Sequence, residues 1–252
     1  NGYNAAHEED SLVYGPNIKD WPEMSPLTDN ILLKVCSKIM DEVTTTDELI
    51  PSGETSSYRS NPLGLAEFTL SRRDPEYVGK SKAVDKLEKA RTAGQKPSEL
   101  DADLNGVFDA IHTISGQENV NEMETEIGSM IYAVKPGDGS AREQAASCQK
   151  VLGGLANICI EYATKRYRSN CVNWGILPFT NPDKEIVLEP GEYVYLPGIR
   201  KAVEEGATKV TATVIGTDGS TRPMELELKN VTEAEKKVLL AGSLINFYKE
   251  EK

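Results

Sequence analysis

An apolar run at residues 130–134, a glycine loop and a helix-like segment follow one another in the middle of this sequence. Gly137 and Gly139 form the loop, and the helix-like segment begins at Ser140. Glycines at such a junction let backbone N–H groups converge on one small space and let a ligand approach closely. Ser140 and Arg142 would then lie at a helix N-terminus, where the helix dipole attracts anions. Because Arg binds carboxylates through two parallel hydrogen bonds, this junction predicts a site for an organic acid.

The same residues also fit a purely structural explanation. Ser140 and Glu143 have the spacing of a capping box, in which a serine and a glutamate satisfy the free N–H groups at a helix start. Capping boxes are far commoner than active sites, so spacing alone favours the structural role. The sequence leaves both interpretations open at this point.

The remaining pattern mixes strands and helices along the whole chain, which predicts an α/β fold. At the first strand, Leu33, Val35 and Ile39 are expected on one side and Lys34 and Lys38 on the other. Two further signals are a hairpin turn at residues 217–220 and a capping box from Thr232 to Glu235. Strands are expected at residues 31–43, 155–160, 176–179, 192–196, 210–215 and 224–228, and helices at 62–70, 75–93, 104–114, 140–152, 163–174, 199–205 and from 232 to about 249.

The composition excludes several classes of function. The 252 residues are 38% hydrophobic and 27% charged, with a net charge of −12, which is typical of a globular protein with a substantial core. An acidic surface repels phosphate backbones, so we expect no nucleic-acid partner. No membrane-spanning run and no signal-peptide pattern is found, so the expected location is cytoplasmic. Since the sequence begins at Asn1 rather than Met, we expect an excised fragment or a processed subunit.

The cysteines and histidines do not form a metal-binding pattern. None of the four cysteines belongs to a CxxC pair, and we interpret all four as small buried hydrophobic residues. A metal site needs clustered ligands, so no metal is expected in this chain. Of the two histidines, His112 has apolar neighbours and is expected to be structural. The cysteines are Cys36, Cys148, Cys159 and Cys171, and the other histidine is His7.

Residues 1–30 are polar and interrupted by prolines, so they are expected to form an extended segment. Tyr14 and Trp21 are its expected anchors, packing on this chain or, alternatively, on another domain. A second polar stretch, residues 44–61, is long and contains glycine, which is typical of loops that carry function.

Four segments together resemble the C-terminal swivel domain of the aconitase family. Residues 137–146, GDGSAREQAA, are similar to the G-E-G-S-S-R-E-H-A-A segment of that family. Thr45-Thr46-Asp47, with Gly53 and Tyr58-Arg59-Ser60-Asn61, resembles its S-T-D-H-I…G…F-R segment. Asn170 with residues 174–179, WGILPF, resembles N-L…G-L-L-P-L, and residues 241–246, AGSLIN, resemble A-G-S-A-L-N.

The resemblance implies a swivelling β/β/α domain of aconitase type at residues 31–252, with a helical insert at about 75–127. Residues 1–30 would be a linker from other domains. The implied activity is that of a hydro-lyase, which dehydrates and rehydrates a hydroxy di- or tricarboxylic acid such as citrate. In this family a 4Fe-4S cluster on other domains supplies the Lewis acid, so the isolated chain is expected to be inactive and free of iron.

The resemblance also assigns roles residue by residue. Ser140 matches the catalytic base, and Arg142 and Arg59 match the two arginines that bind substrate carboxylates. Asp47 matches an acidic residue close to the active site. Gly139 and Ala141 match substrate-facing positions of the loop.

Several departures leave the substrate open. Ala141 stands where the family has a second serine, Gln144 and Glu48 where it has histidines, and Asp138 where it has glutamate. Two alternatives also remain. One is a small subunit like that of isopropylmalate isomerases. The proline-rich lead-in, residues 1–30, and the insert at about 75–127 disfavour this alternative, because those subunits are compact. The other is a noncatalytic anion-binding or interaction module.

Overall fold

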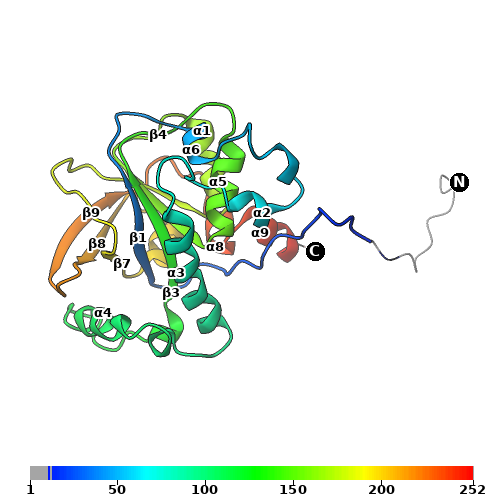
Figure 1. The fold of residues 1–252 in the computed structure, drawn as a ribbon. Coiled ribbons are helices and arrows are strands. Elements are labelled where there is room, and N and C mark those ends of the chain that lie inside the picture. Colours follow the sequence, from blue (N-terminus) through cyan, green and yellow to red (C-terminus); the bar gives the residue numbers. More distant parts are fainter. Residues whose placement is uncertain (1–10, 12, 252) are drawn as a thin grey trace, which may run out of the picture.

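The computed structural model describes residues 11 and 13–251, and in this part of the chain seven strands close into a barrel (Figure 1). Their order around the barrel is β1-β3-β5-β6-β9-β8-β7. The run from β1 through β3 and β5 to β6 is parallel, and the other pairs are antiparallel. The strands are β1 Ile31–Ile39, β3 Glu126–Ala133, β5 Gly154–Cys159, β6 Leu177–Thr180, β7 Tyr193–Leu196, β8 Lys209–Ile215 and β9 Thr221–Glu227.

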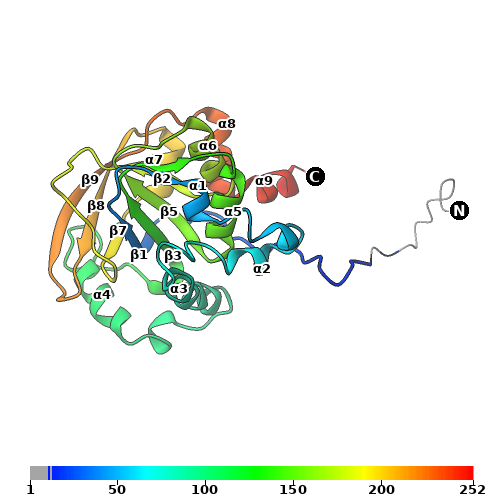
Figure 2. The ribbon, with the colours of Figure 1, turned by 45° about the horizontal axis from the view of Figure 1, so that its top comes forward.

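Helices connect the parallel strands, as parallel pairing requires, because the chain must return to the same end of the sheet. Helices α3 and α4 lie on one side of the barrel and α6, α7 and α8 on the other (Figure 2). The helices are α1 Thr46–Leu49, α2 Pro62–Ala66, α3 Tyr77–Thr92, α4 Asp103–His112, α5 Arg142–Val151, α6 Lys165–Asn173, α7 Ile199–Glu205, α8 Glu233–Ala241 and α9 Leu244–Glu250, with 3-10 turns η1 Ser56–Tyr58, η2 Pro97–Glu99 and η3 Glu122–Glu124. Among the described residues, no helix has the length and apolar character needed to cross a bilayer.

The apolar residues form one cluster inside the barrel and a second between the barrel and the helices. Strand β1 contributes to both, with Leu33 and Val35 inside and Leu32 outside. A bulge between Val35 and Ser37 shifts the register, so that Ile39 lies in the outer cluster. The prediction that Leu33, Val35 and Ile39 share one side was therefore wrong for Ile39.

The mixed α/β fold is confirmed, together with most elements and the capping box at Thr232. Two predicted elements end differently. Strand β1 ends at Ile39 rather than at residue 43, and the expected terminal helix is split at Gly242 into α8 and α9. Strand β3 begins at Glu126 and includes most of the apolar run at residues 130–134. The domain limits 1–30, 31–252 and 75–127 stay predictions.

The lead-in before β1 packs against the C-terminal helices over its last part and extends away from the body before that (Figure 1). The backbone N–H of Leu27 donates to the carbonyl of Leu240, and Asn246 donates to the carbonyl of Met24. The ring of Trp21 lies 4.4 Å from that of Trp174, centroid to centroid. Trp21 thus anchors the lead-in to this chain itself, whereas Tyr14 is exposed.

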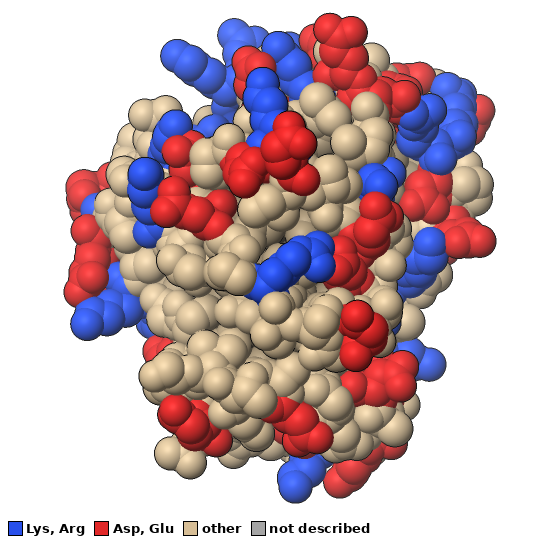
Figure 3. All heavy atoms as spheres, turned by 90° about the vertical axis from the view of Figure 1, so that its left-hand side faces the viewer, with Lys and Arg blue, Asp and Glu red and all other residues tan. Residues whose placement is uncertain are grey.

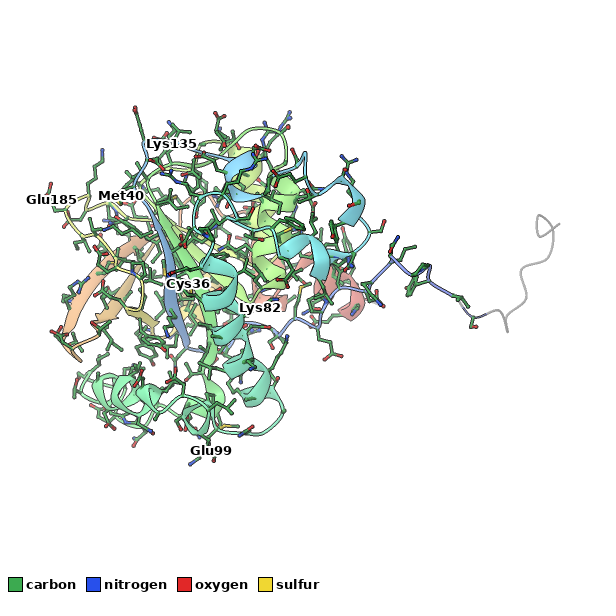
Figure 4. The ribbon with its side chains drawn as sticks, in the orientation of Figure 1. Cys36, Met40, Lys82, Glu99, Lys135 and Glu185 are labelled. Carbon is green, nitrogen blue, oxygen red and sulfur yellow. The ribbon has the colours of Figure 1, made fainter. Side chains whose placement is uncertain are left out.

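A small two-stranded sheet, which the sequence did not predict, brings two distant segments together. Strand β2, Thr44–Thr45, pairs in parallel with β4, Pro136–Asp138. They follow β1 and β3, so the sheet lies at the carboxyl ends of those strands. Figure 4 shows Met40 and Lys135 at this same end of the barrel.

Two glycines allow β4 and its following turn to fit between neighbouring elements. Gly137 has φ +100°, and a Cβ there would lie 2.1 Å from Cδ1 of Tyr167 in α6. Gly139 has φ +134°, and a Cβ there would lie 2.3 Å from Oγ1 of Thr46 in α1. Any other residue would meet backbone strain and a steric clash at both positions. The loop is therefore held between α1 and α6.

We expect Gly137→Ala to lower the free energy of unfolding by about 3 kcal/mol or more, because strain and overpacking add. Gly219→Ala is the control, since Gly219 also has positive φ but a Cβ there would meet nothing within 4 Å. It should cost only about 1 kcal/mol. Urea denaturation of both variants measures the difference, and equal costs would show that Tyr167 does not confine the loop.

Candidate active site

The glycine loop leaves Ser140 exposed at the start of α5. The predicted helix start at Ser140 was wrong, because α5 begins at Arg142 and its N-cap is Ala141. The N-cap makes no side-chain hydrogen bond, so the predicted Ser140–Glu143 capping box is absent from this described segment. Glu143 instead accepts a hydrogen bond from Nε1 of Trp174, at 3.1 Å.

The Ser140 hydroxyl forms no hydrogen bond within the described part of the chain, and it is accessible from solvent. The structural explanation for this serine is thereby removed. What remains is a hydroxyl group beside the positive end of a ten-residue helix.

Arg142 is the first residue of α5 and is half-buried. Its Nε atom is buried and has no hydrogen-bond partner among the described residues. A buried donor without a partner is costly, and a ligand carboxylate would satisfy it. This feature, next to Ser140, is what distinguishes the loop from an ordinary helix start.

Asp47 is held in place by contacts that the sequence did not reveal. It lies in α1, directly after Thr46, which packs against Gly139. Its Oδ1 accepts hydrogen bonds from the backbone N–H and hydroxyl of Ser52, and its Oδ2 pairs with Arg72 at 3.0 Å. Arg72 also pairs with Glu54 at 2.7 Å. The contact with Glu54 and, to a smaller extent, that with Asp47 raise the pKa of the Arg72 guanidinium.

Glu48 has a structural role that explains its presence next to Asp47. The Thr45 hydroxyl accepts from the backbone N–H of Glu48, and the Glu48 carboxylate accepts from the backbone N–H of Thr45. These two bonds form a capping box at the start of α1. The T-x-x-E spacing could have revealed it in the sequence.

Arg59 lies apart from the other predicted site residues. It is exposed in the turn between η1 and α2, and its side chain forms no ion pair within the described residues. No hydrogen bond in this part of the chain links it to Ser140 or Arg142. The structure thus brings together Asp47, Gly139, Ser140, Ala141 and Arg142, and leaves Arg59 on a neighbouring loop.

The cysteines do not fit an iron–sulfur cluster. All four are buried and free, and burial raises the pKa of the Cys36, Cys148 and Cys171 thiols to about 12. Cluster ligation requires thiolates that converge on one point. Over residues 11 and 13–251, no three His, Cys, Asp or Glu side chains gather in a way that could hold a metal ion. His112 is structural, as predicted, since its Nε2 lies 2.7 Å from the carbonyl oxygen of Val120.

Known proteins show what this chain is similar to. No protein-family profile matches the chain. Aconitate hydratase A of Rickettsia felis and that of Rickettsia conorii are each 24% identical to it over 92% of its length. This chain is related to the aconitase family. It spans 27% of the length of these two aconitate hydratases.

A solved structure shows the same fold. The 3-isopropylmalate dehydratase (leuD) of Methanocaldococcus jannaschii superimposes with a TM-score of 0.51 at 20% sequence identity. The match covers 88% of this chain and 95% of that one. This likeness is one of fold.

We expect Ser140→Ala to change the free energy of unfolding by no more than about 0.5 kcal/mol, because Ser140 caps nothing. Thr232→Ala is the matched control, since Thr232 does cap α8 through the Glu235 N–H. Its loss should cost about 1 kcal/mol. Thermal or urea unfolding of both variants would show it, and an equal cost for Ser140→Ala would restore the capping role.

Proposed function

We propose that this chain is the C-terminal domain of an aconitase-like hydro-lyase, and that it supplies the catalytic base and carboxylate-binding arginines. The observation that supports this most is the pairing of an uncapped, exposed Ser140 with the unpartnered Nε of Arg142. The relationship to aconitate hydratases over 92% of the chain supports the reaction class. The proposed substrate is a hydroxy di- or tricarboxylic acid.

In the proposed reaction, Arg142 binds a substrate carboxylate and places the neighbouring C–H group against Oγ of Ser140. Ser140 then takes up the proton, while the hydroxyl group on the next carbon leaves. A serine can act as a base only if its anion is stabilised, and here Arg142 and the N–H groups of Gly139 and Ala141 offer that stabilisation. Arg59 would reach a second carboxylate once its loop closes over the substrate.

Asp47 would act from α1, where its pairing with Arg72 offsets the negative charge that would otherwise oppose a Ser140 anion. Its two oxygens already accept hydrogen bonds from Ser52 and Arg72, so its position does not depend on the substrate. Asp47 belongs to the proposed catalytic set together with Ser140.

A Lewis acid for the departing hydroxyl group would come from other domains or a partner subunit, because this chain's described cysteines are buried and dispersed. In the family this is a 4Fe-4S cluster. The lead-in at residues 1–30 is proposed to connect to those domains, and the barrel to swivel against them. A cytoplasmic location stays a prediction.

An isopropylmalate-type small subunit remains the second candidate, since the solved relative is matched over 95% of its length. Complementation with cluster-bearing domains distinguishes the aconitase-like domain from the isopropylmalate-type subunit. Turnover of a citrate-like acid would identify the first, and turnover of a malate-like acid the second. A noncatalytic module would turn over neither.

With the cluster-bearing domains present, Ser140→Ala should lower kcat by about 10²–10⁴-fold and leave KM little changed, because a base acts mainly in the transition state. Arg142→Lys should instead raise KM and lower kcat, since Lys cannot form the bidentate contact. Ser220→Ala, in the exposed β8–β9 hairpin, is the control and should be fully active. A Ser140→Ala enzyme with wild-type kcat would refute the proposed base.

Even in the isolated chain, citrate should bind weakly at the N-terminus of α5, since Arg142 and the helix dipole both favour an anion. NMR titration should shift the amide signals of Gly139 and Ser140, and Arg142→Met should abolish these shifts. Lys201→Met removes one exposed positive charge elsewhere and should preserve them. Shifts confined to other surfaces would contradict the site.

A further inference from the structure

A cavity lies at the C-terminal end of α5, opposite the end that carries Ser140. It has a volume of about 360 Å³ and lies between lead-in residues 22–26, α3, the end of α5 and the first residues of β3 and β5. These are the amino ends of the parallel strands, whereas the glycine loop follows their carboxyl ends. Helix α5 has ten residues, so about 15 Å separates the two ends.

Three of the six charged side chains that line this cavity already have partners, and a fourth, Glu23, is exposed to solvent. Lys89 pairs with Asp85 at 2.7 Å. Both carboxylate oxygens of Glu88 contact Arg91, and one of them also accepts from the backbone N–H of Ile127. These groups are satisfied without a ligand.

Glu126 and Lys150 differ from the others. Glu126 is only 5% exposed, and its Oε2 is buried without a hydrogen-bond partner in the described structure. Lys150 is half-buried and forms no ion pair within 4 Å across residues 11 and 13–251. Glu126 and Lys150 thus line the same cavity, as a buried acid and a half-buried base that form no ion pair with each other.

For both groups, the cost of burial outweighs the stabilisation that their charges receive from neighbours and from each other. Burial, and after it the charge of Glu88, raises the pKa of Glu126 to about 8. Burial also lowers the pKa of Lys150. A molecule that places a positive group at Glu126 and a negative group at Lys150 would reverse both shifts.

Part of the wall is apolar. Met24, Ile127, Val151 and Leu155 line the cavity beside the two charged groups. Ligand sites commonly combine an apolar wall with a few polar groups that fix orientation, in cavities of roughly 300–1,000 Å³. An α-amino acid with an unbranched apolar side chain has the ammonium, the carboxylate and the size that this cavity requires.

We infer that this cavity is a binding site for a small zwitterion of the amino-acid class, with its ammonium at Glu126 and its carboxylate at Lys150. This inference does not depend on the proposed function, because the site shares no residue with the glycine loop. The lead-in forms part of its wall, so an occupant would also hold residues 22–26 against the barrel.

The test uses the full 252-residue chain and three probes of similar shape. L-Norleucine carries both charges, hexanoate lacks the ammonium and pentylamine lacks the carboxylate. We expect norleucine to shift the NMR amide signals of Gly153 and Gly154, which line the cavity. Each single-charge probe should bind about tenfold more weakly or worse, since a hydrogen bond between charged groups is lost.

Glu126→Gln and Lys150→Met should each weaken norleucine binding by about tenfold or more. Lys89→Met is the matched control, because Lys89 lines the same cavity but is exposed and paired with Asp85. Its effect should stay within about twofold. Arg142→Met should also have no effect, which separates this cavity from the acid site, and circular dichroism confirms that each variant is folded.

Three outcomes would overturn the inference. The first is an absence of saturable shifts at Gly153 and Gly154, which would mean that water alone bridges the two charges. The second is equal affinity for all three probes, which would mean that only the apolar wall is recognised. The third is loss of norleucine binding in Arg142→Met alone, which would place the probe at the N-terminus of α5.

Discussion

The close contact of Gly137 with Tyr167 and of Gly139 with Thr46 determines how this end of the barrel is built. These contacts let β4 lie between α1 and α6 while it pairs with β2. The pairing brings the segment after β1 next to the segment after β3, so Asp47 and Ser140 become neighbours although they are far apart in the sequence. A side chain on Gly137 would collide with Tyr167 and one on Gly139 with Thr46, so the glycine loop could not keep this position.

The buried strands of the barrel hold this arrangement in position. Strands β1 and β3 are buried on both faces, by apolar residues inside the barrel and by the helices outside, which leaves them little freedom to shift. The face with β7, β8, β9 and α4 is different, since acidic and basic side chains are scattered over it with uncharged surface between them (Figure 3). The parallel half of the barrel therefore positions the candidate site, and the antiparallel half completes the closed sheet.

The sequence predicted most of the elements because their signals are local. Thr232 caps its helix as its spacing predicted, and the hairpin at residues 217–220 joins β8 to β9. The same kind of spacing gave a wrong prediction at Ser140. After the turn at Gly139, α5 begins only at Arg142, and Glu143 accepts a hydrogen bond from Trp174 instead of capping the helix. A β-bulge places Ile39 on the other face of β1, and no local sequence pattern predicts such a bulge.

The candidate site was only partly predictable for a similar reason. Resemblance pointed to Ser140, Arg142 and Asp47, whose motifs are continuous in sequence. Arg72, which fixes Asp47, lies in a turn with no motif, and its role follows from the tertiary fold alone. The unpaired state of Glu126 and Lys150 also depends on burial and distance, which the order of residues does not show.

The contact between the tilted rings of Trp21 and Trp174 gives the molecule an intrinsic fluorescence probe. The chain has two tryptophans, and both belong to this one contact. The indole of Trp174 also donates to Glu143, the residue next to Arg142. Intrinsic tryptophan fluorescence therefore reports a single place in this protein, where the lead-in lies against the end of α6 and Trp174 is hydrogen-bonded to α5. Release of the lead-in changes that emission without any label.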